Sequence, residues 1–354
     1  MPAGSPQPVP QHRPWRLLRA PLVLPAVIYA SAALAQVDVN RAVADVNAQM
    51  RANNVQLLYR RADIYLGAGD VAHAIADYAE ILRAQPDDLK AHYRLALAYR
   101  VKGDFTAAIG EYDRIIAQAP QEADAYTGRG FAESATKARG KAMEDFGKAI
   151  ALMPDDAVAY FNRAEVMREL GYQTAALRDY DKAITIDARS APFFVGRGKV
   201  YAARRDDAKA LSDFNEAIRL EDKASAPYRA RGKLRLAQGD TAAAIADFSQ
   251  AIRRDRTDVE ALLNRAMARI RGGATEKALY DVTDALRYAP LDANLYVVRA
   301  VAKLRLGWTL AARDDAARAL VLRPGLASAE SVQLAATQAI ERQAQAATTA
   351  PPAR

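Results

Sequence analysis

Side chains that could carry out catalysis are few in this sequence, and they lie far apart. The three histidines are His12, His73 and His92, and none has a second histidine close to it in the sequence. Cysteine is absent, which excludes disulfides, thiolate catalysis and cysteine–zinc sites. An active site brings several reactive groups together. The sequence therefore predicts a protein that is not an enzyme and that has no metal and no cofactor.

Adjacent carboxylates are the other candidates for acid–base chemistry. They occur as Asp87-Asp88 and Asp155-Asp156. Each pair precedes a segment with helical character, and an aspartate at that place accepts hydrogen bonds from the first backbone N–H groups of a helix. We interpret both pairs as helix caps.

A charged pattern recurs along the chain, in which an arginine is followed sixteen residues later by an aspartate. The arginines are Arg61, Arg129, Arg163, Arg197, Arg231, Arg265 and Arg299, and the aspartates are Asp77, Asp145, Asp179, Asp213, Asp247, Asp281 and Asp315. The pattern fits either a basic stripe for anionic partners or a series of internal ion pairs. We favour ion pairs, because guanidinium and carboxylate groups suit partly buried contacts.

These charges belong to a repeat that runs along most of the chain. Pro86, Pro120 and Pro154 are evenly spaced, and eight units fit this frame without insertions. The eighth residue of each unit is always alanine or glycine, and the twentieth is always alanine. A fixed period of about 34 residues is typical of a solenoid, in which each unit buries its apolar face against its neighbours. The predicted units are 55–88, 89–122, 123–156, 157–190, 191–224, 225–258, 259–292 and 293–326.

Each unit has the pattern of two helices. In the second unit, Gly103 and Asp104 separate two apolar stripes, because glycine ends one helix and aspartate caps the next. Glycine occupies this turn in six units, whereas Lys137 and Arg205 replace it in the third and fifth. We expect those two turns to be looser or shifted.

The repeat resembles the tetratricopeptide repeat family over residues 55–326. The resemblance implies an all-α fold, a right-handed superhelical α-solenoid of eight helix–turn–helix repeats with a capping helix at each end. It also implies a non-enzymatic scaffold or adaptor that binds a protein or peptide partner on the concave surface formed by the first helices. The concave positions, by resemblance, give the candidate site Tyr59, Arg60, Tyr93, Arg94, Phe131, Phe161, Asn162, Lys199, Arg229, Lys233 and Asn264.

Part of this surface is similar to the clamp with which some family members hold a carboxyl-terminal aspartate. Arg229, Lys233 and Asn264 match its beginning, but Asn294 and Val298 do not fit the rest. That function is therefore not implied. Two other functions stay open, namely a subunit of an envelope export or polysaccharide machine and a glycan-binding solenoid with sugar rings stacked on the aromatic residues.

The first 35 residues have a different composition from the repeats. They contain seven prolines, three arginines and no acidic residue, and an apolar run follows that ends in Ala33-Leu34-Ala35. This pattern is typical of a secretory signal peptide cleaved after Ala35. The apolar run is about 16 residues long, shorter than the roughly 20 that a membrane anchor needs. We expect a bacterial protein, periplasmic or secreted, with no integral membrane segment after cleavage; a retained anchor is the alternative.

The mature chain would carry 47 basic and 42 acidic residues, a net charge of +5. No run of lysine and arginine concentrates this excess, so we do not expect a nucleic-acid partner. Residues 36–54 are predicted to form an amino-terminal capping helix, a degenerate half-repeat, and residues 327–345 a carboxyl-terminal capping helix. The tail, 346–354, is predicted to be disordered. The sequence does not predict the oligomeric state.

Overall fold

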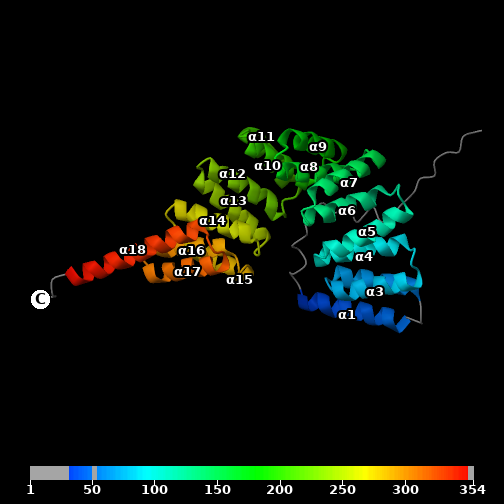
Figure 1. The fold of residues 1–354 in the computed structure, drawn as a ribbon, viewed down its shortest axis with the longest axis horizontal. Helices are drawn as coiled ribbons and strands as arrows, with labels where there is room; N and C mark the ends of the chain where they lie inside the picture. The colour runs from blue at the N-terminus through cyan, green and yellow to red at the C-terminus, as the bar shows by residue number, and fades with distance from the viewer. Residues whose placement is uncertain (1–31, 50–53, 350–354) are drawn as a thin grey trace, which may run out of the picture. The chain divides into compact units, whose positions relative to one another are not determined.

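The computed structural model describes residues 32–49 and 54–349, which form eighteen α-helices and no strand (Figure 1). The prediction of an all-α helical repeat fold is confirmed. The helices belong to two compact units, one ending at Ala188 and the other beginning at Arg189. The predicted signal peptide falls mainly on residues 1–31, which lie outside the described residues, whereas Ala32–Ala35 begin α1.

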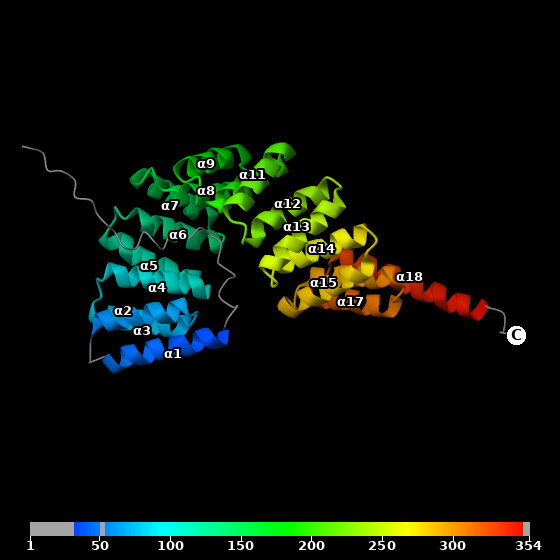
Figure 2. The same cartoon turned by 180° about the vertical axis from the view of Figure 1, so that it is seen from behind.

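The first unit contains α1 and four helix pairs, which are repeats one to four. The bounds are α1 Ala32–Gln49, α2 Val55–Gly67, α3 Val71–Ala84, α4 Leu89–Lys102, α5 Phe105–Gln118, α6 Ala123–Ala135, α7 Arg139–Leu152, α8 Ala157–Glu169 and α9 Gln173–Ile186. The second helices α3, α5 and α7 each pack on the first helix of their own repeat and on the first helix of the next, and α9 packs on α8 (Figures 1 and 2).

The second unit contains repeats five to eight and the carboxyl-terminal helix. The bounds are α10 Ala191–Ala203, α11 Asp207–Leu220, α12 Ser225–Ala237, α13 Thr241–Arg254, α14 Val259–Arg271, α15 Thr275–Tyr288, α16 Ala293–Arg305, α17 Thr309–Leu322 and α18 Ala327–Thr349. The first helix of every repeat begins at the residue where the predicted repeat unit begins.

The first helices form the inner layer of each unit. In the first unit α6 contacts α8, and in the second α12 contacts both α10 and α14. Across the described helices, the second helices of successive repeats make no comparable contact. The more closely spaced layer of a curved stack lies on its inner side, so the first helices form the concave surface of each unit.

Local sequence explains where the helices begin and end. Gly103 ends α4 with a φ of 82°, a conformation that glycine adopts without steric cost. The Asp104 carboxylate then accepts a hydrogen bond from Ala107 N at the start of α5. Asp88 and Asp156 cap α4 and α8 in the same way, as the sequence predicted.

The turns at Lys137 and Arg205 differ from the expectation of looser or shifted geometry. Both residues adopt positive φ, 65° and 63°, close to the glycines of the other repeats. Ala138 N donates to Glu133 O at 2.8 Å, the same bond that Asp104 N makes to Tyr99 O at 2.9 Å. Packing of the two flanking helices holds the turn geometry, so these two residues accept an unfavourable backbone conformation.

Small residues face large rings in the core of each repeat. The alanines at position twenty have no exposed surface, and at Gly130 an added Cβ would stand 3.1 Å from the backbone oxygen of Ala142. At Gly198, an added Cβ would stand 2.7 Å from the ring of Phe214. The ring therefore occupies the space that a side chain would need, which lets the two helices approach closely.

The predicted ion pairs form between the two helices of each repeat. In all seven repeats with the pattern, Nε and Nη2 of the arginine donate to the two carboxylate oxygens of the aspartate at 2.6–3.0 Å. These aspartates are buried and the arginines are about one fifth exposed. The interpretation as internal ion pairs is confirmed, and the seven arginines do not form a free basic stripe.

A helix covers each end of the repeat array. α1 packs on α2 and buries Val43 and Val46, and its Asn47 accepts a hydrogen bond from Arg61 at 2.8 Å. α18 packs on α16 and α17 and continues to Thr349, beyond the predicted end at 345, because its alanine-rich sequence favours helix. Residues 350–354 of the predicted disordered tail lie outside the described residues. None of the described helices combines the length and apolar character needed to span a membrane.

Candidate functional site

Three of the four candidate aromatic residues are part of the core. Tyr59 is 4% exposed, Phe131 8% and Phe161 4%. Phe161 packs on Tyr180, with the ring centres 6.0 Å apart. The expectation that these rings offer open stacking area to a partner does not fit this burial.

Cationic side chains cover two of these rings from the inner surface. Lys90 Nζ lies 4.0 Å from the centre of the Tyr59 ring, and the Arg100 guanidinium lies 4.0 Å from the centre of the Phe131 ring. The Tyr59 hydroxyl donates to Asp88 at 2.8 Å. Burial raises the pKa of Tyr59, and its hydrogen bond to Asp88 adds to this effect, so the phenol stays neutral. The cations, rather than the rings, face outward.

Tyr93, Arg60 and Arg94 stay at least partly accessible in repeats one and two. Arg60 is exposed, and Arg94 Nη1 lies 3.4 Å from Asp63 Oδ1, which links α4 to α2. Tyr93 packs edge-on against Tyr112 at 6.3 Å between ring centres.

The site includes residues that the candidate set missed. Val101 is 37% exposed, and Leu97 is partly exposed on the same helix, α4. Arg100 forms no ion pair with a described residue; its Nη1 donates to the Tyr112 hydroxyl at 3.3 Å, and its buried Nε has no hydrogen-bond partner. These residues occupy positions nine, twelve and thirteen of repeat two, positions that the resemblance assigns to the concave surface.

Asn162 in α8 is buried rather than presented to a partner. It is 3% exposed, and its Oδ1 accepts no hydrogen bond from any described residue. Nearby, the Tyr180 hydroxyl donates to Glu165, which also accepts from Arg168 Nη2 at 2.8 Å. Burial raises the pKa of Tyr180, and the charge of Glu165 raises it further. The inner surface here is a set of internally satisfied charges above a packed core.

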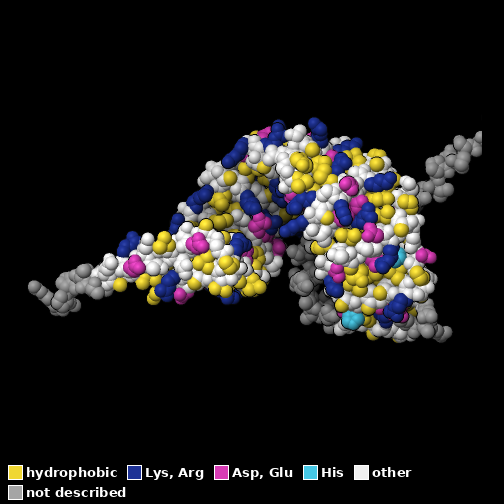
Figure 3. Space-filling model, viewed as in Figure 1, with side chains coloured by type: hydrophobic (Ala, Val, Ile, Leu, Met, Phe, Trp, Pro, Cys, Tyr) yellow, Lys and Arg dark blue, Asp and Glu magenta, His cyan; other side chains and the backbone are white. Residues whose placement is uncertain are grey.

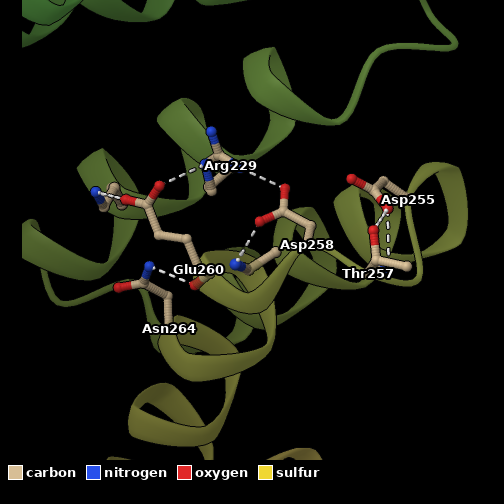
Figure 4. A network of polar contacts seen from close by, with 8 residues as sticks. Arg229, Asp255, Thr257, Asp258, Glu260 and Asn264 are labelled. Atoms are coloured by element: carbon tan, nitrogen blue, oxygen red, sulfur yellow. Dashed lines mark hydrogen bonds and ion pairs between the residues drawn. The ribbon is translucent and has the colours of Figure 1, made fainter. Parts of the chain in front are cut away.

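The remaining candidates lie in the second unit, where four residues form a network around Glu260 (Figure 4). Arg229 contacts both Asp258 and Glu260, the latter at 3.1 Å, and Lys233 pairs with Glu260. Asn264 Nδ2 donates to the Glu260 carbonyl at 2.7 Å. Burial alone would raise the pKa of Glu260, but the hydrogen bond from Lys233 and the charges of Arg229 and Lys199 lower it overall.

This network neutralises most of the positive charge expected on the second unit's inner surface. Arg229 and Lys233 are held by acids at the amino-terminal end of α14, and Lys199 is exposed. The three residues that match the beginning of a carboxylate clamp are therefore committed to contacts within the chain. Sequence position alone could not show this, because Asp258 and Glu260 lie a whole helix pair further along the chain than their partners in α12.

Candidate metal-binding clusters are absent from the described part of the chain. No group of three or more histidine, cysteine, aspartate or glutamate side chains there could hold a metal ion. His92 is buried between Glu111, at 2.6 Å from Nδ1, and the Pro86 carbonyl, at 2.9 Å from Nε2. On the face shown in Figure 3, basic and acidic side chains are interspersed over both units.

Comparison with protein families matches two tetratricopeptide repeat models to the chain, over residues 59–123 and 229–284 and over residues 157–190. These matches fall in phase with the helix pairs described above. The chain is a tetratricopeptide repeat protein. Proteins of this family are generally non-enzymatic scaffolds for protein–protein interaction. No curated protein matches the chain significantly.

Solved structures show the same fold at low sequence identity. A chain of the APC/C hetero-tetramer Cut9-Hcn1 superposes with a TM-score of 0.63 and 16% identity, over 85% of this chain and 59% of that one. A tetratricopeptide repeat protein from Parabacteroides merdae gives 0.54 and 19%, over 70% and 98%. PilF of Pseudomonas aeruginosa gives 0.53 and 19%, over 60% and 96%. This chain thus spans about three fifths of the Cut9-Hcn1 chain it matches.

Proposed function

We propose that this tetratricopeptide repeat protein is a scaffold or adaptor that binds a protein or peptide partner on the inner surface of repeats one and two. The observation that carries the proposal is the combination of exposed Val101 with Arg100, whose guanidinium has no carboxylate among the described residues. Exposed Arg60 lies on the neighbouring first helix. Apolar area beside guanidinium groups is the composition that dominates binding hot spots.

A protein partner fits this surface better than a glycan does. Sugar rings would need open aromatic faces, but Tyr59, Phe131 and Phe161 are buried. Guanidinium groups instead bind backbone carbonyls and carboxylates of a peptide. The proposal involves no catalysis, cofactor or nucleic acid.

We also propose that the protein acts in the bacterial periplasm or is secreted. The support is the composition of residues 1–35, with its arginines, apolar run and Ala33-Leu34-Ala35. A partner would then belong to the cell envelope or to the exported proteins.

Affinity capture with matched variants tests the proposed binding site on the inner surface. Immobilised protein is incubated with the envelope fraction of the source cells, partners are identified by mass spectrometry, and the purified partner is titrated calorimetrically. Arg60→Ala, Arg94→Ala and Val101→Ala should each weaken binding, with a loss of about thirtyfold where the residue is a hot spot worth about 2 kcal/mol. Thermal unfolding should change little, since Arg60 and Val101 are exposed and Arg94 loses only a partly exposed ion pair with Asp63.

Exposed second-helix residues provide the control. Lys148 lies on α7 and Lys182 on α9, and both are exposed. The variants Lys148→Ala and Lys182→Ala should therefore bind the partner as the native chain does. If these two changes abolish capture while the three inner-surface variants bind normally, the partner uses the outer surface and the assignment is wrong.

A further inference from the structure

An open cleft lies on the outer surface of the second unit, between the second helices α13 and α15. Its volume is about 510 Å³, and its lining includes Arg265 of α14. Arg253 and Arg256 line one side, and Arg287, Asp284 and Tyr288 line the other. Four arginines and one acid therefore surround a single opening, away from the inner surface considered above.

The arginines differ in how far the chain neutralises them. Arg265 is bound by Asp281 at 2.7 Å and also donates to Ser249 at 3.1 Å. Arg287 contacts Asp284 at 3.3 Å, and its side chain is 76% exposed. Arg253 and Arg256 are exposed, and neither has an ion pair or a hydrogen bond with a described residue. Asp284 is thus the single acid facing three guanidinium groups that are not otherwise committed.

Equivalent positions in other repeats do not carry this excess. Arg219 stands one repeat before Arg253, and Glu216 neutralises it at 2.6 Å. Thr185 takes the corresponding place in repeat four. Arg256 stands where repeats one, two, three, seven and eight have proline. The cluster is therefore a local feature of repeats six and seven rather than a consequence of the repeat pattern.

We propose that this cleft binds an acidic segment of a protein partner, with side-chain carboxylates held by Arg253, Arg256 and Arg287. Planar guanidinium groups bind carboxylates through two parallel hydrogen bonds. Tyr288, 46% exposed at the rim, offers apolar area for the methylene groups of the same segment.

The small extent of the cluster favours a short acidic segment over a long polyanion. A nucleic acid or charged polymer requires a basic track across several repeats. Here the neighbouring Arg219 is already neutralised, and Val321 follows at the same position in repeat eight. The cluster is therefore limited to Arg253 and Arg256, which have no ion pair among the described residues, and Arg287, which is paired only with Asp284.

Fluorescence anisotropy with a fluorescein-labelled hexaglutamate peptide tests the proposal at low ionic strength. The full chain should bind the peptide. Arg253→Ala/Arg256→Ala should lose at least about tenfold in affinity, equivalent to about 1.4 kcal/mol. Asp284→Asn should bind more tightly, because it removes the single acid of the cleft. Arg219→Ala, the matched change one repeat away, should bind within about twofold of the native chain.

Four results would overturn the proposal. They are no binding by the native chain, native-like binding by the double variant with an unchanged circular dichroism melt, an equal loss in Arg219→Ala, and displacement of the peptide by inorganic phosphate at equal concentration. Arg94→Ala/Val101→Ala distinguishes binding in the cleft from binding at the site proposed on the inner surface. This variant should bind hexaglutamate normally, and a loss there would place the peptide on the inner surface and refute the cleft.

Discussion

Glu133 is a buried carboxylate that lies near the buried Asp145 of the same repeat. It is 6% exposed, and its Oε2 accepts no hydrogen bond from the described residues. The same position holds Arg235 and Arg269, whose Nη1 atoms lie 2.9 Å and 2.7 Å from the buried aspartates Asp247 and Asp281. In repeat three a carboxylate therefore stands where these repeats place a cation beside the buried aspartate.

Burial raises the pKa of Glu133 to about 7, and the charge of Asp145 adds to this, although Arg129 and Lys141 oppose it. The ordinary value is 4.5. Because the folded chain has the higher pKa, it binds the proton more tightly than the unfolded chain does. The stability from this group is therefore fully present below about pH 4.5 and is lost as the pH rises through about 7.

Glu133→Gln should remove this pH dependence. We expect the variant to be more stable than the native chain by about 2 kcal/mol near pH 8, with a much smaller difference near pH 5. Urea unfolding followed by far-UV circular dichroism at both pH values measures it. Glu144→Gln removes an exposed acid from the adjacent helix and should show no such difference. An advantage of equal size at both pH values would mean that ionisation of Glu133 is not the cause.

Repeat two replaces the ion pair of the other repeats with a different buried contact. Leu95 and Glu111 stand in place of the arginine and aspartate, and His92 reaches Glu111 across the helix pair. Since the Pro86 carbonyl can only accept a hydrogen bond, His92 Nε2 carries hydrogen. The histidine thus links the two helices of repeat two.

Among the helices, the backbone conformation of the turn within a repeat is determined by the packing of the two flanking helices rather than by the residue in the turn. Lys137 and Arg205 adopt the same backbone as the glycines, although a left-handed conformation costs about 1–2 kcal/mol for a residue with a side chain. Neighbouring contacts from α6 with α7 and from α10 with α11 are preserved. Each of these two turns stores unfavourable backbone energy.

Lys137→Gly and Arg205→Gly should therefore stabilise the protein, each by about 0.5–1 kcal/mol after allowing for the greater freedom of glycine in the unfolded chain. Differential scanning calorimetry should show higher melting temperatures for both variants. The converse change, Gly103→Lys at a φ of 82°, should lower the melting temperature. If the glycine variants melt at or below the native temperature, the lysine and arginine side chains contribute contacts that outweigh the strain.

For the whole molecule, the composition of residues 1–35 predicts export. Expression in a Gram-negative host should give a periplasmic chain that begins at Gln36, as measured by intact-protein mass spectrometry. Ala35→Asp should block processing, because the cleavage site requires a small residue there. Native protein that retains Met1 in the cytosolic fraction would contradict the prediction.

The repeat, the helix pairs and the ion-pair partners could all be predicted from the sequence. These follow from local chemistry: Gly103 and Asp104 punctuate a helix pair, and a constant repeat period keeps Arg163 and Asp179 in the same register as their counterparts in other copies. Alanine and glycine at fixed positions likewise show where two helices approach. The candidate surface positions could be assigned to helices, but not to exposed or buried states.

Whether a candidate side chain is exposed, and whether its charge is neutralised, depends on the tertiary structure. The residues that contact it lie at the start of the first helix of the following repeat. Tyr59 of α2 is covered by Lys90 and bonded to Asp88 at the beginning of α4, and Arg229 of α12 is neutralised by Asp258, which caps α14. An isolated helix pair contains neither contact. The lining of the outer cleft also depends on the tertiary structure, since its arginines come from two repeats. The repeat pattern determines which helices pack against each other, and the contacts made in that packing determine which side chains remain accessible to a partner.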